Sequence, residues 1–503
     1  MNYLSLVAVY SLFHVFFPEE LIRRSAREVP DEPFGVFVTL TRGPHSAVHG
    51  CIGNWSAAFQ KVPSGEIVNW VQQLSQDARH RDQRRFQFLK DVNEDVSTTL
   101  TISVMLLPLY LVNTYTGALP NSEWFRNEEY GLIFQSENGQ RATYLPGVFV
   151  NETWNNISTS LVRKAGLTSR EQGTFYAYRT LTVEVEIYNF LFSVRGLYFI
   201  EREVAAFYEK HFEDFVPYEF DARTGQVTVD KSQAVRNAAT LVDVLHLSKK
   251  FGALLNWADK PVLENLNYYF QKWYSFEQDF THASIFLLRA YTLLYNQGVD
   301  SVQKRVALLE DNLYDALLTL EPQFAMGEAV STLASLVNAA TPPEYMDKLL
   351  KACTLMRSRL ETFKVSRLRR GNTQQLDLVF ELNWQSQSAH KMLEVVLSSF
   401  PEQVPFFQAF VSELSEMVLS ILGTNLPHTL ETNYLVVVYE CLCHLEKSFL
   451  LVGEPVPVTL KQQKFLFYTT LLETRRGPSG LFYFRNSTVA RLDLTGHTLL
   501  INL

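Results

Sequence analysis

Cysteine is scarce in this chain of 503 residues, which holds four, at Cys51, Cys353, Cys441 and Cys443. Four cysteines at such spacings form no disulfide framework of the kind found in small secreted domains. Residues two apart on a helix point to different faces, so we expect no zinc site at Cys441 and Cys443. This usage favours a reducing compartment, and we expect the protein to be cytoplasmic.

Other absences exclude whole classes of function. The formal net charge is −8 and no basic stripe runs along the chain, so we expect no nucleic-acid partner. The sequence has no phosphate-binding loop, HExxH zinc helix, nucleophile elbow or dinucleotide glycine fingerprint. Its 11 histidines show no close pair at metal-ligand spacing with a third ligand nearby. We therefore expect no metal site and no cofactor.

The apolar first residues could form a signal peptide, a membrane span or a helix of the folded domain. Met1–Phe17 is mostly apolar, but it lacks the basic start and the small-residue cleavage site of a signal peptide. It is also interrupted by His14 and too short for a membrane span. Pro18-Glu19-Glu20 is typical of a helix start. We favour a docked pair of helices and no stable membrane span, with secretion or anchoring through this segment as the alternative.

Strand patterns prevail in the first part of the chain. Val36, Val38 and Leu40 alternate with other residues, and Asn138-Gly139 separates two apolar runs in the manner of a hairpin turn. Thr153–Ala165 predicts a helix that ends at Gly166. The pattern predicts an α+β domain with a mixed, mainly antiparallel sheet and helices.

Helix patterns replace the strand patterns after Tyr188. Ala283–Leu294 carries an apolar face, and Ala329, Leu333, Leu336 and Ala340 mark another. Tyr434–Leu450 is apolar around much of its circumference, which predicts a buried helix. Turn residues separate segments of helical-hairpin length, which indicates an all-α domain of repeated hairpins. We place the two domains at residues 1–193 and 194–503.

The first domain carries several motifs in a fixed order. They are Phe34–Leu40, Gly50-Cys51-Ile52-Gly53, Tyr130-Gly131-Leu132, Thr143–Val148, Trp154 and Lys164–Leu167. In this order they resemble the AMMECR family over about residues 20–190. The resemblance implies a compact α+β domain with the Gly-Cys-Ile-Gly strand beside a cleft, and it names a domain without naming a reaction.

Cys51 and His49 are the candidate catalytic residues of this domain. Residues two apart on a strand share a face, and an imidazolium beside the thiol would favour the nucleophilic thiolate. The alternative is that Cys51 is a small residue packed in a tight place. Two departures from the family pattern weaken an arginine-dependent role. His49 stands where the family has arginine, and Asp82–Phe86 lacks the prolines that usually follow.

Three short sets of residues in the second domain resemble the α/α toroid superfamily, which includes six-hairpin glycosidases. They are Tyr218–Gly225 with Val235–Ala238, Met326–Ala329, and Arg491–Asp493 with Gly496-His497. The resemblance covers about residues 195–503 and implies a central cavity rimmed by the N-terminal ends of the inner helices.

The toroid resemblance also supplies candidate site residues. Glu328 and Asp493 are candidates for general acid and base acting on a sugar. The candidates for ligand binding are Arg236, Trp384, Arg491 and His497. The structural alternatives are an ion pair between Arg491 and Asp493, a helix-capping role for Glu328 and a core position for Trp384.

Three functions are compatible with the sequence. The first is an AMMECR-domain protein whose toroid binds or modifies a carbohydrate, with a small molecule or a sugar as ligand. The second is a non-catalytic scaffold for a protein partner. The third is a thiol-dependent enzyme that uses Cys51. The sequence leaves open whether the protein is an enzyme.

Overall fold

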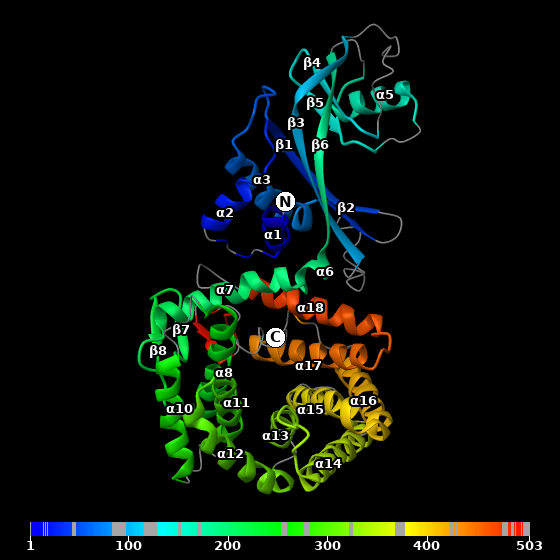
Figure 1. Cartoon of the computed structure of the whole chain (residues 1–503). Coiled ribbons are helices and arrows are strands. Elements are labelled where there is room, and N and C mark those ends of the chain that lie inside the picture. Colours follow the sequence, from blue (N-terminus) through cyan, green and yellow to red (C-terminus); the bar gives the residue numbers. More distant parts are fainter. Residues whose placement is uncertain are drawn as a thin grey trace. The chain divides into compact units, whose positions relative to one another are not determined.

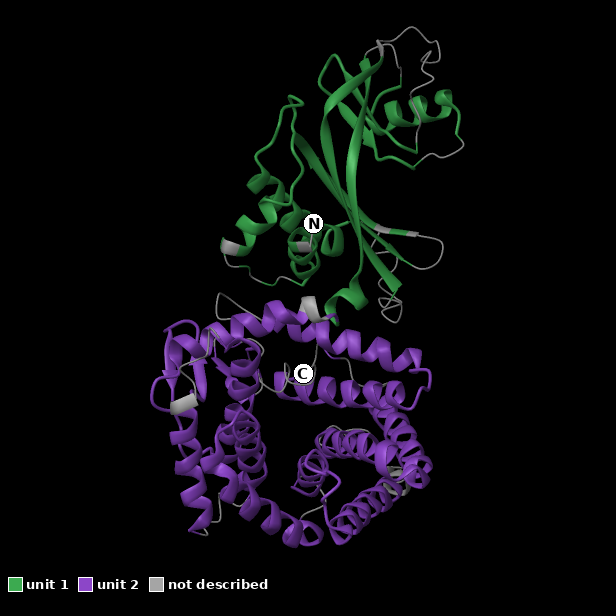
Figure 2. Ribbon diagram, viewed as in Figure 1, with its two compact units in different colours: residues 1–192 green, residues 193–503 purple. Residues whose placement is uncertain are grey.

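The computed structural model describes most of the chain in two compact units, residues 1–192 and 193–503 (Figure 2). The described residues are 2–13, 15, 17, 19–42, 47–82, 97–114, 128–148, 152–168, 173–252, 259–275, 282–320, 325–367, 378–422, 427, 430–474, 481–483, 487, 489–493 and 495. The N-terminal unit mixes strands and helices, and residues 190–475 are mostly helical, so the predicted fold class is confirmed.

A six-stranded antiparallel sheet forms the centre of the first unit, with the strand order β2-β1-β3-β6-β4-β5 (Figure 1). The strands are β1 (Pro33–Arg42), β2 (Ala47–Trp55), β3 (Thr98–Thr114), β4 (Gly131–Ser136), β5 (Arg141–Tyr144) and β6 (Gly173–Glu186). The turn between β4 and β5 contains Gly139 at φ 81°, a left-handed conformation that glycine adopts without steric cost.

Five described helices pack against this sheet or against one another. They are α1 (Asn2–Ser11), α2 (Glu19–Ala26), α3 (Ser64–His80), α5 (Trp154–Lys164) and α6 (Ile187–Leu191). Helix α3 contacts β1 and β2, and α1 packs against α2 and α3. Val7, Ala8 and Val9 are fully buried. The apolar N-terminal segment therefore contributes core to the first unit, as the docked helix pair predicted.

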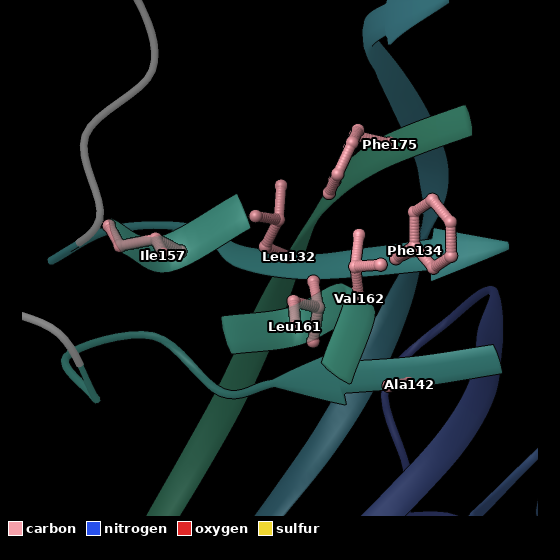
Figure 3. Close-up of a cluster of buried hydrophobic side chains, with 7 residues drawn as sticks. All are labelled: Leu132, Phe134, Ala142, Ile157, Leu161, Val162 and Phe175. Carbon is pink, nitrogen blue, oxygen red and sulfur yellow. The ribbon is translucent and has the colours of Figure 1, made fainter. Parts of the chain in front are cut away.

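A buried cluster attaches α5 to the β4–β5 hairpin. It consists of Leu132, Phe134, Ala142, Ile157, Leu161, Val162 and Phe175 (Figure 3). The helix begins with the Thr153 side chain accepting a hydrogen bond from the backbone of Asn156, and Gly166 at φ 81° follows its end. The local signals in the sequence thus set both ends of this helix.

The second unit consists mainly of helices that follow one another in hairpins. They are α7 (Val194–His211), α8 (Ala234–Lys250), α10 (Asp259–Tyr274), α11 (Ala283–Asn296), α12 (Gln303–Ala316), α13 (Ala325–Ala334), α14 (Pro343–Arg367), α15 (Leu378–Ser399), α16 (Val404–Leu422), α17 (Thr432–Leu451) and α18 (Val458–Thr474). Short 3-10 helices occupy Asp300–Val302, Leu317–Thr319 and Pro401–Gln403.

Alternate helices of this unit form its interior. Helix α8 packs against α11, α13 packs against α15, and α15 packs against α17. Every residue of α13 is buried, whereas α12 and α14 carry many exposed side chains. Helix α17 is buried over most of its length, as predicted from Tyr434–Leu450.

The apolar face expected to run from Ala329 to Ala340 extends less far than the sequence predicted. Helix α13 ends at Ala334, and Leu336 and Ala340 lie in the turns that follow. The Asn338 side chain closes one of these turns by accepting a hydrogen bond from the N–H of Ala340 at 2.8 Å. An asparagine of this kind competes with the helix for backbone partners.

A small sheet brings the end of the chain beside α7 and α8. It has the order β8-β7-β9 and consists of β7 (Glu219–Asp221), β8 (Gln226–Thr228) and β9 (Val489–Arg491). Elsewhere in this unit, the helical segment Pro401–Leu422 is long and apolar enough to cross a membrane, by length and composition alone. Of its most apolar window, 44% is buried. A core helix of a folded domain meets the same criterion.

Candidate functional site

Cys51 lies on β2, near one edge of the sheet in the first unit. The strand register places Cys51, Thr39, Thr101 and Glu184 opposite one another on four neighbouring strands, so these side chains share one face. The Thr39 hydroxyl donates a hydrogen bond to the sulfur of Cys51 at 3.2 Å. Cys51 is half-buried and its backbone N–H donates to the Asp82 carboxylate at 2.9 Å. The thiol therefore lies between the Thr39 hydroxyl and an apolar cluster that includes Phe37 and Tyr178.

The two glycines that flank this position are explained by close packing. A Cβ atom at Gly50 would lie 2.3 Å from the carbonyl oxygen of Ala78 on α3, and one at Gly53 would lie 2.2 Å from the Phe37 ring. A larger residue at either position would therefore force the backbone or an aromatic side chain to move. The close contacts with α3 and with the Phe37 ring therefore explain why glycine occupies both positions.

The predicted pair of Cys51 and His49 requires that side chains alternate regularly between the two faces along β2. The register between β1 and β2 shifts next to Gly50, where the cross-strand partners pass from Gly50 directly to Val48. A bulge of this kind interrupts the regular alternation along the strand. The His49 side chain lies outside the described part of the structure. The hypothesis of a Cys51–His49 pair therefore remains a prediction.

Three of the predicted site residues of the second unit come together. The N–H of Leu492 donates to the carbonyl of Tyr218 at 3.1 Å, which holds the end of β9 against β7. Asp493 then accepts a hydrogen bond from Arg491 at 3.0 Å and lies 3.8 Å from the Nε atom of Arg236. Arg236 also donates to the Tyr218 hydroxyl at 2.7 Å. We call Tyr218, Arg236, Arg491 and Asp493 the Arg236 site.

The Arg236 site joins a buried carboxylate to an accessible guanidinium. The Asp493 side chain is 6% exposed, whereas that of Arg236 is 43% exposed. Tyr208 and Asp243 lie close enough to contribute electrostatically, since burial and then the charges of Asp243 and Asp493 raise the pKa of Tyr208. The Tyr208 hydroxyl is buried and has no hydrogen-bond partner among the described residues. No sequence motif pointed to Tyr208 or Asp243.

Glu328 has a different environment. Its carboxylate lies 2.6 Å from the guanidinium of Arg289 on α11. Arg289 also donates to Thr332 at 2.6 Å and to Ser331 at 3.1 Å, both on α13. The Glu328 side chain is 5% exposed. Glu328 is thus part of an ion pair that ties α11 to α13.

Trp384 belongs to the contact between α13 and α15. A Cβ atom added at Gly327 would lie 2.7 Å from the Cβ atom of Trp384. The Ser388 hydroxyl donates to the carbonyl oxygen of Gly327 at 2.6 Å in the same contact. His497, the remaining candidate, lies outside the described residues. Among the residues that the structure covers, no three His, Cys, Asp or Glu side chains gather in a way that could hold a metal ion.

The fold thus defines a protein with an α+β unit and a helical unit. Residues 9–188 match the AMMECR1 family, so the first unit contains an AMMECR domain and the resemblance found in the sequence is confirmed for this part. No curated protein and no solved structure is significantly similar to the chain.

Proposed function

We propose that the second unit of this AMMECR-domain protein is an α/α toroid that binds a carbohydrate at the Arg236 site without cleaving it. The alternation of buried and more exposed helices along α8 to α17 supports the toroid. In such an arrangement the inner helices present their N-terminal ends to one rim, and Arg236 lies in the first turn of α8.

The half-exposed Arg236 guanidinium carries this proposal. It is held in place by the Tyr218 hydroxyl at 2.7 Å and by the Gln233 side chain at 3.0 Å. A planar guanidinium fixed in this way presents donors in a set geometry, which suits neighbouring hydroxyl groups of a sugar. The Tyr218 ring adds an apolar surface, and few well-placed polar groups beside aromatic rings are typical of ligand sites.

The charge partners of the two candidate carboxylates favour binding over hydrolysis. A glycosidase needs one carboxylic acid that stays protonated near neutral pH and one free carboxylate. Asp493 has Arg491 as its partner and Glu328 has Arg289, so each carboxylate is engaged by an arginine and the two are held by different elements.

The proposal predicts that replacing Arg236 by alanine abolishes stabilisation by sugars. A ligand that binds the native state raises the apparent melting temperature, so a thermal-shift screen of the full chain against a broad oligosaccharide library should identify at least one stabilising sugar. We expect Arg236→Ala to remove the shift, because the side chain supplies charged donors that each contribute about 1.5–3 kcal/mol.

Arg202→Ala is the matched control, because Arg202 is an exposed arginine on α7. This variant should respond to the sugar as the original chain does. A sugar that stabilises the original chain and Arg236→Ala equally would place its site elsewhere. If no sugar in the library stabilises the chain, the carbohydrate proposal fails and a scaffold becomes the better account.

Thiol chemistry at Cys51 is a second candidate, favoured by the position of its sulfur. The side chain is half-buried, on a sheet face with exposed polar residues, and Thr39 donates to the sulfur at 3.2 Å. The other three cysteines are buried. Burial raises the pKa of Cys441 to about 12 and that of Cys443 to about 11, and it also raises the pKa of Cys353.

We therefore expect mild alkylation of the native protein to label Cys51 in preference to the other cysteines. The thiolate is the reactive form, so thiols with raised pKa values react slowly. Peptide mass spectrometry after brief iodoacetamide treatment measures the labelled site, and Cys51→Ser should reduce labelling to background. An unlabelled Cys51 in the native chain would remove the thiol candidate.

A further inference from the structure

The Arg236 guanidinium has one edge that the described part of the protein leaves open. Its Nη1 atom donates to the Tyr218 hydroxyl at 2.7 Å and to the Gln233 side chain at 3.0 Å. Its Nε atom lies 3.8 Å from the Asp493 carboxylate, which is too far for a hydrogen bond. The Nη2 atom has no hydrogen-bond partner among the described residues. Both N–H groups of Nη2 therefore remain available to a ligand.

The carboxylate beside this guanidinium is already engaged by another arginine. Arg491 donates from Nε to one oxygen of Asp493 at 3.0 Å and from Nη2 to the other oxygen. Such a bidentate pair uses both oxygens of the carboxylate. The Asp230 carboxylate, which precedes α8, accepts from the N–H of Ser232 at 3.0 Å and from its hydroxyl at 2.6 Å. Arg236 is thus a permanent cation that shares no hydrogen bond with a carboxylate among the described residues.

Two further acidic residues belong to this neighbourhood. Glu219 on β7 lies close enough to Arg491 for its charge to raise the pKa of that guanidinium. Asp243 is 4% exposed on α8, and its charge acts on the buried Tyr208. Neither carboxylate forms a hydrogen bond or an ion pair with Arg236. The group that lacks a bound carboxylate is therefore one guanidinium, within a neighbourhood that holds charges of both signs.

The first turn of α8 adds backbone donors at the same place. The N-cap residue, Gln233, makes no capping hydrogen bond through its side chain, and no acidic residue lies in the first turn. The N–H groups of Val235 and Arg236 have no hydrogen-bond partner among the described residues. The contact between the Arg236 guanidinium and Gln233 at 3.0 Å places the guanidinium over this turn. A helix start with free N–H groups favours a negatively charged group.

We propose that the carbohydrate bound at the Arg236 site is an acidic sugar, a hexuronic acid whose carboxylate pairs with Nη2 of Arg236. This inference rests on the proposed carbohydrate site and names the class of sugar that the site takes. The planar guanidinium matches the geometry of a carboxylate, and the N–H groups at the start of α8 supply further donors. The sugar ring packs against the Tyr218 ring. A neutral sugar leaves the Arg236 charge without an acceptor of opposite charge.

Calorimetric titration of the full chain with matched pairs of ligands tests the inference. The ligands are oligosaccharides of galacturonate, of alginate and of hyaluronan, each compared with its own methyl ester, which keeps the shape of the sugar and removes its charge. We expect at least one acidic form to bind about tenfold or more tightly than its ester, as expected for a charged hydrogen bond. Added salt should weaken binding of the acid more than binding of the ester, because salt screens partly exposed charges.

Two variants assign the preference for the acid to one side chain. Arg236→Gln removes the charge and keeps an amide donor, so the affinity for the acid should fall to about that for the ester. Affinity for the ester should fall by a smaller factor, and the difference between the two factors measures the coupling between Arg236 and the sugar carboxylate. Arg202→Gln is the matched control, because Arg202 is an exposed arginine on α7, and it should keep the full preference for the acid.

The possible failures are distinguishable. Equal affinity for acid and ester, or binding of neutral sugars with none of the three uronates bound, would overturn the acidic class and leave carbohydrate binding intact. A preference for the acid that persists unchanged in Arg236→Gln would place the carboxylate at another residue and would also overturn the inference. If neither the uronates nor any neutral sugar binds, the proposed function itself fails.

Discussion

Glu328→Ala is expected to lower the free energy of unfolding of the helical unit by about 3–5 kcal/mol, because it leaves the Arg289 charge without its carboxylate inside the protein. The pair has a separation of 2.6 Å, with side-chain exposures of 25% for Arg289 and 5% for Glu328. Water therefore replaces the lost partner only in part. Urea denaturation followed by circular dichroism measures the change, since most of the helix belongs to this unit.

Two comparisons make this prediction specific to the buried pair. Glu413→Ala breaks the Arg357–Glu413 pair, whose side chains are 26% and 22% exposed, and it should cost less, about 1 kcal/mol or below. The double variant Arg289→Met with Glu328→Leu should recover much of the loss, because an apolar pair needs no charge compensation. A Glu328→Ala protein as stable as the original would show that the ion pair does not hold α11 to α13.

Acid is expected to destabilise the helical unit well above the pH at which carboxylates protonate. Burial, with the charges of Arg289 and Lys249, lowers the pKa of His246 to about 4, and burial lowers that of His390 to about 4. An imidazole in an unfolded chain has a pKa of about 6.5. Below that pH the unfolded state therefore binds more protons than the folded state, and folding stability falls.

The loss begins near the unfolded pKa and is complete once the pH has passed through the folded pKa of about 4. Each of the two histidines contributes up to about 3 kcal/mol over this range. The raised pKa of Glu201, which burial causes and Lys250 moderates, works in the opposite direction. Its proton binds more readily in the folded state and offsets part of the loss.

Denaturant titrations at several pH values between neutral and about pH 4 measure this slope. His390→Gln should flatten the profile, because the substituted side chain cannot bind a proton. His282→Gln is the control, since His282 is exposed and should leave the slope unchanged. A His390→Gln profile that parallels the original would mean that His390 is not the source of the acid sensitivity.

Local signals were sufficient to predict much of the first unit. The Asn138-Gly139 turn, the end of α5 before Gly166 and the antiparallel sheet follow from residue types whose conformational preferences act within a few positions. The bulge beside His49 was not predictable in this way. It depends on how β2 fits against β1, and a period-two pattern contains no information on such a shift.

Contacts between site residues that lie far apart in the sequence were harder to predict. The pairing of Arg491 with Asp493 was foreseen because the residues are two positions apart. Arg289 as the partner of Glu328 was not, because 39 positions separate them and helix packing alone brings them together. The same holds for Tyr208 beside Asp493, where α7 meets the end of the chain.

The proposed carbohydrate binding by the helical unit depends on the Arg236 side chain. Equilibrium titration of the original chain, Arg236→Ala and Arg202→Ala with the sugar selected by the thermal screen measures this dependence. Arg236→Ala should weaken binding by about tenfold or more, as expected for loss of a charged hydrogen bond, whereas Arg202→Ala should bind the sugar like the original chain. Equal affinity of all three proteins for the sugar would show that the Arg236 site does not bind it.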